Sequence, residues 1–146
     1  MSHPMHSVSV AGILVDERDR ALVIRRRDNR QWEPPGGVLE VGETISDGLR
    51  RELREETGLD VAAGDLTGVY KNMDRGIVAL VFRCAAVSGE LTLNAEVSEF
   101  RWMTPAEVRQ ELDEAYAVRV LDAIANDGAQ VRAHDGRRLV PPVSPQ

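Results

Sequence analysis

One short segment holds the residues best suited to chemistry, GGVLEVGETISDGLRRELREETGL at positions 36–59. It opens with a double glycine and ends with three closely spaced glutamates, which are Glu52, Glu55 and Glu56. Carboxylate oxygens suit Mg²⁺ or Mn²⁺, which keep several water ligands and take phosphate oxygens as further ligands. The segment therefore predicts a divalent-cation site that acts on a phosphate-containing molecule.

A helix over residues 44–57 is expected to position these glutamates. Thr44 is a suitable N-cap, Asp47 stands in the capping-box position, and Gly58 stands where a C′ glycine belongs. At about 100° per residue, the three glutamates fall within one third of the helix circumference. The aliphatic residues on the same side are Ile45, Leu49 and Leu53. Glu52 and Glu56 are therefore predicted to point toward the body of the protein, in a cluster of three partly buried carboxylates.

The run R-R-E-L-R-E-E is also typical of an ordinary solvated helix face. The apolar surroundings of the glutamates and the double glycine before them favour a cation site instead. Clustered, partly buried carboxylates repel one another unless they are protonated or bind cations. Arg51 stands four residues before Glu55 and can pair with it, and the glycine turn allows the carbonyl of Gly36 to complete the site.

Strands are predicted on both sides of this helix. Short apolar runs indicate them at residues 7–15, 21–26, 61–71, 76–86 and 100–103. The first two are expected to pair as a hairpin, and the continuous apolar run at 76–86 predicts a central strand. Residues 28–37 are expected to form a loop, because adjacent prolines and adjacent glycines do not fit a helix or a central strand.

The C-terminal part predicts more helix. Thr104 begins the sequence T-P-A-E, which places proline at the first helical position and glutamate at the third. Apolar residues then continue with helical spacing to Gly128, as one helix or as two with a break near Leu112. The tail VPPVSPQ is expected to be extended or disordered.

Composition limits the classes of protein that fit. The 146 residues suit one domain, and the net charge of −6 argues against binding to a nucleic-acid duplex. Cys84 is the only cysteine, so no internal disulfide can form. No apolar run has the length of a membrane span, and the first residues lack the features of a secretory signal. We expect a cytoplasmic protein without a membrane partner.

The glycine, glutamate and arginine positions match a known pattern. From Gly37 the order is glycine, five residues, glutamate, seven residues, Arg-Glu-Leu, one residue, Glu-Glu, one residue, Gly-Leu. This resembles the Nudix box, G-x5-E-x7-R-E-U-x-E-E-x-G-U with U aliphatic, at every defined position. The resemblance implies an α/β protein with the Nudix fold, a mixed β-sheet sandwiched between helices (α/β/α sandwich). It implies a domain at residues 1–126, and residues 127–146 are expected to be a partly disordered C-terminal extension.

The resemblance also implies the reaction. It is the hydrolysis of the pyrophosphate linkage of a nucleoside diphosphate derivative, with Mg²⁺ or Mn²⁺ as cofactor. The implied metal ligands are Gly36, Glu52, Glu55, Glu56 and Glu99. Glu52 or Glu99 would take the proton from the attacking water, and Arg51 completes the catalytic residues. Glu99 is preferred to Glu96 as the additional glutamate because it adjoins the strand at 100–103.

Three residues are expected to bind substrate, namely Arg26, Trp32 and Lys71. For Arg26 the alternative is a solvent-facing position in a run of arginines, and for Trp32 it is packing against its own hairpin. The short chain and the absence of ADP-ribose or dinucleoside-polyphosphate markers favour a (deoxy)nucleoside triphosphate. The competing hypothesis is a non-catalytic nucleotide sensor, although all box glutamates are present. The expected partners are this small molecule and, in a homodimer, a second copy of the chain.

Overall fold

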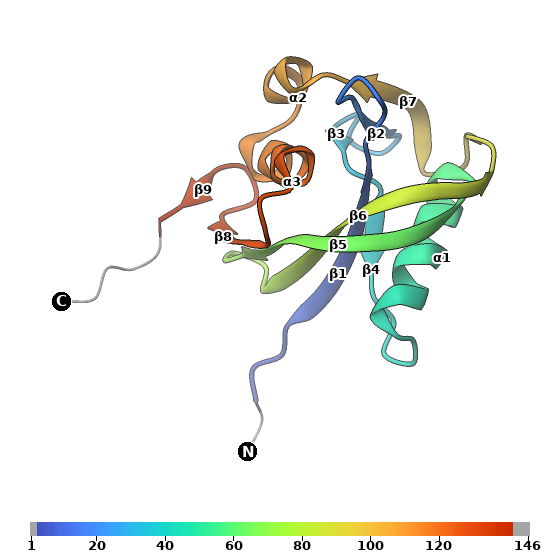
Figure 1. The fold of residues 1–146 in the computed structure, drawn as a ribbon. Helices are drawn as coiled ribbons and strands as arrows, with labels where there is room; N and C mark the ends of the chain where they lie inside the picture. Colours follow the sequence, from blue (N-terminus) through green and yellow to red (C-terminus); the bar gives the residue numbers. More distant parts are fainter. Residues whose placement is uncertain (1–2, 142–146) are drawn as a thin grey trace.

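A mixed six-stranded sheet forms the centre of the computed structural model, which describes residues 3–141 (Figure 1). Its strands, in spatial order, are β4 (Gly36–Val38), β1 (Ser7–Leu14), β6 (Ile77–Gly89), β5 (Leu59–Asn72), β8 (Gln130–His134) and β9 (Leu139–Val140). The β1–β6 and β5–β8 pairs are parallel, and the others are antiparallel. The predicted central strand is confirmed, because β6 has neighbours on both sides.

A second, three-stranded sheet has the order β3 (Trp32–Glu33), β2 (Ala21–Arg26) and β7 (Val97–Met103). The predicted hairpin between the first two strands is wrong, because only the isolated bridge between Val15 and Ala21 joins them. Residues 21–24 are fully buried, and β2 finds its main partner in the distant β7. The predicted loop at 28–37 contains the short strand β3 and the start of β4.

The helices are α1 (Ile45–Thr57), α2 (Pro105–Glu111) and α3 (Glu114–Ala125). The predicted caps of α1 are confirmed: the Thr44 hydroxyl accepts from the backbone N–H of Asp47 at 3.1 Å, and Gly58 is left-handed with φ 82°. The capping box of α2 is formed as well, and Leu112 ends that helix, so the region contains two helices.

The helices cover opposite faces of the six-stranded sheet, which gives two hydrophobic cores (Figure 1). Leu49 and Leu53 of α1 pack with Val10 and Leu14 in one core. Side chains of α2 and α3 pack in the other, against Ile13, Val81 and further residues of the sheet. The predicted α/β/α sandwich is confirmed.

The segment expected as an extension contributes strands β8 and β9 to the main sheet. Arg132 of β8 is anchored to α3, because its guanidinium donates to both carboxylate oxygens of Asp122 at 2.8 and 2.9 Å. Residues 142–146, within the predicted extended tail, lie outside the described residues.

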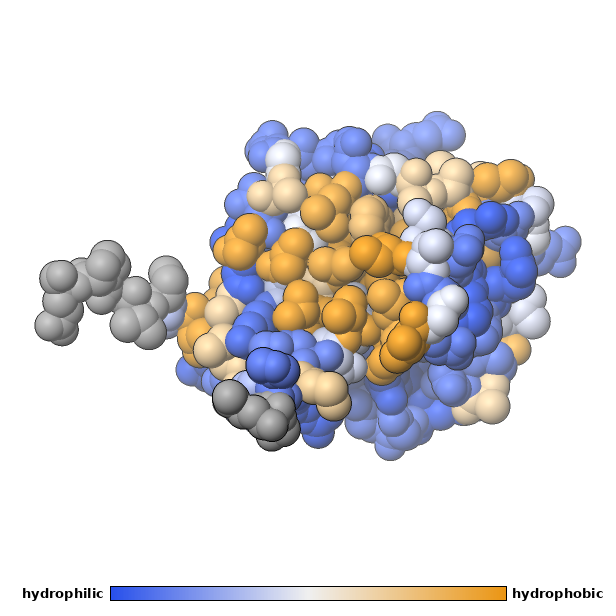
Figure 2. All heavy atoms as spheres, turned by 90° about the horizontal axis from the view of Figure 1, so that it is seen from below, coloured by the Kyte–Doolittle hydropathy of each residue, from blue (hydrophilic) through white to orange (hydrophobic). Residues whose placement is uncertain are grey.

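One face of the molecule is markedly apolar. Figure 2, seen from the side on which the chain begins, shows a broad hydrophobic area with hydrophilic residues around it. On the face of the sheet that carries α1, the partly buried residues include Val8, Val69, Val78 and Leu80. Among residues 3–141, no helix has the length and apolar character needed to cross a bilayer.

Candidate active site

Helix α1 turns two of the three predicted glutamates toward the sheet. Glu56 is 5% exposed, and the side chain of Glu52 is 13% exposed, whereas that of Glu55 is 58% exposed. Leu49 and Leu53 on the same side are fully buried and hold the helix against the sheet. The helix periodicity therefore predicted the direction of Glu52 and Glu56 correctly and overestimated the burial of Glu55.

Glu56 is fixed by the double-glycine strand. Its Oε1 accepts a hydrogen bond from the backbone N–H of Gly36 at 2.7 Å. Burial raises the pKa of Glu56 to about 8, and the charges of Glu33, Glu52 and Glu96 act in the same direction. The hydrogen bond from Gly36 opposes this shift of the pKa but does not cancel it. We call Glu33, Glu52, Glu56 and Glu96 the acidic cluster.

Glu52 lies directly against Gly37. A side chain at Gly37 would overlap with the Glu52 carboxylate, so with glycine here the carboxylate can lie directly against the strand. Burial raises the pKa of Glu52, while its ion pair with Arg51 acts in the opposite direction. A carboxylate that is largely buried beside other carboxylates favours the binding of a cation, because the positive charge offsets the repulsion between the carboxylates.

Arg51 ties the glutamates of the segment together. Its guanidinium donates to Glu55 at 3.3 Å, which confirms the predicted pair, and also to Glu52 at 2.9 Å. Its shortest contact, at 2.6 Å, is with Glu43, eight residues earlier, which accepts a second hydrogen bond from it at 2.9 Å. Arg51 holds the pKa of Glu43 at about 2. Glu43 thus orients Arg51, a role that its position in the sequence pattern did not reveal.

The glutamate carboxylates of the site are not arranged around a common point at which they could all bind one metal ion. No three acidic, histidine or cysteine side chains among residues 3–141 are grouped so that they could hold one metal ion. Three hydrogen bonds accompany this arrangement: Glu52 and Glu55 both accept from Arg51, and Glu56 accepts from Gly36. The donor chemistry fits a hard divalent cation, and only Oε1 of Glu52 accepts from Arg51.

Glu96, rather than the preferred Glu99, acts on the carboxylates of the cluster. The charge of Glu96 raises the pKa of both Glu52 and Glu56, while Glu99 is exposed and lies opposite Arg25 in the β2–β7 pair. Asn94, which the sequence did not single out, explains the difference. Its Oδ1 accepts from the backbone N–H of Glu96 at 3.0 Å, and its Nδ2 donates to the Glu56 carbonyl at 3.0 Å.

A cavity of about 280 Å³ adjoins the double glycine, and Arg26 and Glu33 line it. Arg26 donates to Glu33 at 3.1 Å and to Asp28 at 2.7 and 2.9 Å. Burial raises the pKa of Glu33, and the charge of Arg26 opposes that shift. The predicted substrate residue Arg26 therefore does lie beside the candidate site.

The other two predicted substrate residues lie apart from this cavity. Trp32 is 7% exposed and packs in the core, with the guanidinium carbons of Arg25 and Arg101 5.5 and 5.7 Å from its ring centre. This is the packing alternative considered for Trp32. Lys71 is on the face of β5 opposite to Tyr70, which packs against α3, because neighbouring side chains of a strand point to opposite faces.

Comparison with known proteins settles the family. The model of the NUDIX domain matches residues 5–123. The chain belongs to the Nudix family. The predicted membership and the assignment as a Nudix hydrolase are thereby confirmed, and the candidate site is the Nudix box with the residues that surround it.

Curated Nudix relatives carry different names. A "MutT-like protein" of Streptomyces ambofaciens is 54% identical over 96% of this chain and 91% of its own length. An "ADP-ribose pyrophosphatase" of Methanocaldococcus jannaschii is 34% identical over 66% of this chain and 60% of its own length. A "Nucleoside triphosphatase NudI" of Escherichia fergusonii is 30% identical over 66% of this chain and 82% of its own length.

Solved structures agree with the Nudix fold. The crystal structure of an ADP-ribose pyrophosphatase from Streptococcus suis superimposes with a TM-score of 0.76, covering 87% of this chain and 99% of that one. The sequence identity is 18%, so this likeness concerns the fold alone.

Proposed function

We propose that this Nudix hydrolase is a metal-dependent pyrophosphohydrolase of (deoxy)nucleoside triphosphates. It would cleave the anhydride between the α- and β-phosphates and release a nucleoside monophosphate and pyrophosphate. The observation that carries the proposal is the acidic cluster behind the double glycine, with Glu56 buried at its centre, next to a cavity with Arg26 on its wall. This arrangement supports binding of a phosphate chain through a cation at one end of the cavity.

In the proposed site, Glu52, Glu55, Glu56 and the Gly36 carbonyl hold Mg²⁺ or Mn²⁺, with Glu96 or Glu99 as a further ligand. The cation, when bound, neutralises the pyrophosphate and makes a bound water more acidic. Water attacks phosphorus, the bond from phosphorus to the bridging oxygen breaks, and Glu52 accepts the proton. Arg51, oriented by Glu43, would hold the carboxylates in place and balance part of their charge.

A panel of nucleotides tests the function. We expect pyrophosphate release from nucleoside triphosphates with Mg²⁺ to exceed the hydrolysis of ADP-ribose by at least about tenfold in kcat/KM. The relative named as a nucleoside triphosphatase supports triphosphates, because the match covers 82% of its length. The relative named as an ADP-ribose pyrophosphatase, of which 60% is covered, makes ADP-ribose the competing substrate to test. Nucleotide binding without any turnover would support the sensor hypothesis instead.

A comparison of glutamine variants tests the choice of base. Glu52→Gln should remain about 100-fold below wild type at saturating Mg²⁺ and lose the acidic limb of the pH–rate profile, because the proton acceptor is gone. Glu99→Gln and Glu96→Gln should be partly restored by high Mg²⁺, because a ligand defect weakens metal binding. The measurement is kcat against pH at several Mg²⁺ concentrations. If Glu99→Gln is the variant that metal does not restore, Glu99 is the base.

A further inference from the structure

The sheet face that carries α1 stays apolar well beyond that helix (Figure 2). Leu49 and Leu53 of α1 pack with Val10 and Leu14, at one side of the sheet. On the rest of the same face, every strand or its direct extension contributes an apolar side chain. From β4 to β9 these side chains are Leu39, Val8, Val78, Val69, Val131 and Val140, with Leu80 as a second one of β6. We call these residues the apolar face.

Strand β6 shows that the apolar face lacks a covering layer. On the other face of this strand, Ala79 and Val81 are 1% and 0% exposed, because they pack in the core with α2 and α3. Val78 and Leu80 point the opposite way and stay partly exposed, although β6 is a central strand. On β8, Val131 is 83% exposed. A sheet normally packs its apolar face against another layer, and residues 3–141 leave much of this face without one.

The charges on this face argue against a membrane as its partner. Lys71 of β5, opposite Val78, is the one charged residue among the strand positions of the apolar face in residues 3–141. Surfaces that bind anionic membranes carry several lysines and arginines, whereas this chain has a net charge of −6. The stem of a single lysine can lie along an apolar interface with its ammonium group at the rim. The face therefore suits a protein partner.

The width of the face fits an interface with a second copy of the chain. The six strands of the sheet, about 4.8 Å apart, span about 24 Å. A standard interface buries about 800 Å² on each partner, which is the area of a square about 28 Å wide. The hydrophilic residues around the apolar area would then form the polar rim that such interfaces have (Figure 2).

We propose that the chain forms a two-fold symmetric homodimer in which the apolar faces of two copies pack on each other. A second copy supplies the same aliphatic surface, and a two-fold axis buries both faces at once, so that neither is left open. Two sheet faces pack about 10 Å apart with interdigitated side chains, as in β-sandwiches. The homodimer expected from the sequence thereby gains a defined interface.

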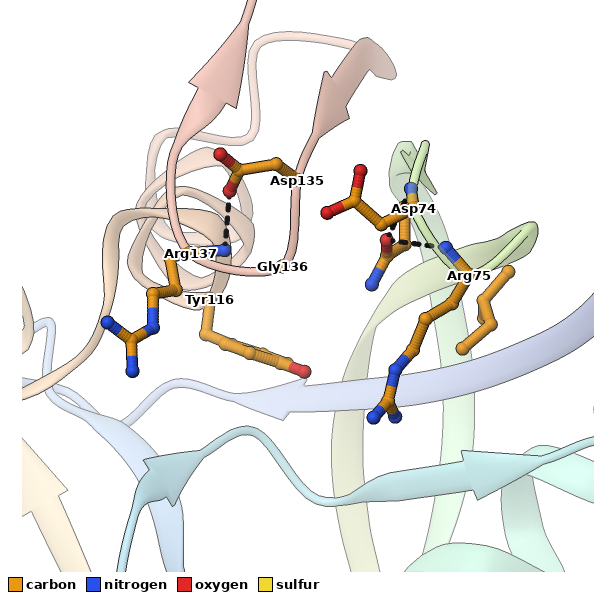
Figure 3. Close-up of a pocket in the computed structure, with 8 residues that line it drawn as sticks. Asp74, Arg75, Tyr116, Asp135, Gly136 and Arg137 are labelled. Carbon is orange, nitrogen blue, oxygen red and sulfur yellow. Dashed lines mark hydrogen bonds between the residues drawn. The ribbon is translucent and has the colours of Figure 1, made fainter.

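The proposed dimer leaves both active-site cavities open. The cavity beside the double glycine is lined by Ala11 and Ala79, which belong to the core on the other face of the sheet. A neighbouring cavity of about 500 Å³ lies on that side too, where Tyr116 of α3 lies between Arg75 and Arg137 (Figure 3). Each copy therefore keeps its own site, and the inference does not depend on the proposed function.

Sedimentation velocity of the full chain tests the dimer. We expect a species of twice the chain mass of 16.1 kDa. Its dissociation constant should be below about 1 µM, as for interfaces of standard size. Val78→Lys places a charge at the middle of the apolar face and should raise this constant at least about 100-fold. Val131→Lys should raise it at least about tenfold, because Val131 lies nearer to the edge of the sheet.

Both variants should keep the fold of the single chain, which circular dichroism checks. The side chains they replace are partly or largely exposed in one copy, so the new ammonium group can reach water. If Val78→Lys fails to fold, Val131→Lys decides. The matched control is Val87→Lys, the same change on the same strand, at a residue that is 66% exposed and lies outside the apolar face. This control should dimerise like the wild type.

Two results would overturn the proposal. One is a wild-type chain that stays monomeric at all concentrations, and dimerisation only after removal of residues 142–146 would then assign the face to that segment. The other is a dimer that both lysine variants form as tightly as the control, since the copies would then meet through another surface.

Discussion

The Glu56→Gln variant is expected to lose about a thousandfold in kcat with Mg²⁺ while keeping its fold. Removing one of the charged metal ligands costs several kcal/mol of transition-state stabilisation, and each 1.4 kcal/mol corresponds to about tenfold in rate. The fold should survive because a glutamine oxygen can still accept the hydrogen bond that the backbone N–H of Gly36 donates to Glu56. The measurements are steady-state kinetics and circular dichroism.

The same variant should be more stable than wild type when metal is removed at alkaline pH. The pKa of Glu56 is about 8 in the folded protein, above its ordinary value of 4.5, so folding favours the protonated carboxyl. The free energy of unfolding of the metal-free wild type therefore falls as the pH rises from about 4.5 through 8. Glutamine carries no such charge, and a gain of about 1 kcal/mol at pH 9 would raise Tm by about 3 °C.

Glu55→Gln is the matched control for stability, because the side chain of Glu55 is 58% exposed. Its Tm in EDTA should equal that of wild type at pH 9, and the Tm values of wild type and Glu56→Gln should converge near pH 5. A Glu56→Gln protein with wild-type activity would show that the carboxylate is not a ligand. A Tm difference independent of pH would show that burial of the charge is not the cause.

The sequence predicted best what depends on near neighbours along the chain. The caps of α1 at Thr44 and Gly58, and the inward direction of Glu52 and Glu56, follow from helical geometry over a few residues. The apolar spacing continues across Leu112, so it allowed either one helix or two helices with a break there. The structure has two helices.

Features that depend on distant contacts could not be predicted in this way. The β2 strand pairs with β7, which lies more than 70 positions further along the chain, rather than with the neighbouring β1. Glu96 enters the acidic cluster because Asn94 ties its turn to the end of α1, a contact across 38 positions. Arg119 lies 3.0 Å from the ring of His134, which belongs to a strand placed outside the expected domain. The types of these residues do not indicate which residues distant in the sequence lie next to one another in the fold.

Withdrawal of divalent metal is expected to abolish hydrolysis. Treatment with EDTA followed by gel filtration should lower the rate to less than about 1% of the starting value, and added Mg²⁺ or Mn²⁺ should restore it. The physical reason is the charge of the site. A phosphate chain brings further negative charge to a cluster in which burial and mutual repulsion already raise the pKa of Glu56, so a bridging cation is needed.

Metal binding should also be visible without turnover. Mg²⁺ at about 100 times its dissociation constant stabilises a folded protein by about 2.7 kcal/mol, which corresponds to a rise in Tm of about 5 to 10 °C. The rise should be much smaller in Glu56→Gln and intermediate in Glu55→Gln, because Glu55 is exposed and faces Arg51 before the ion binds. Full activity in EDTA, after elemental analysis confirms that the metal is gone, would contradict the mechanism. A Tm that ignores Mg²⁺ in the wild-type protein would place the ion on the substrate rather than on the glutamates.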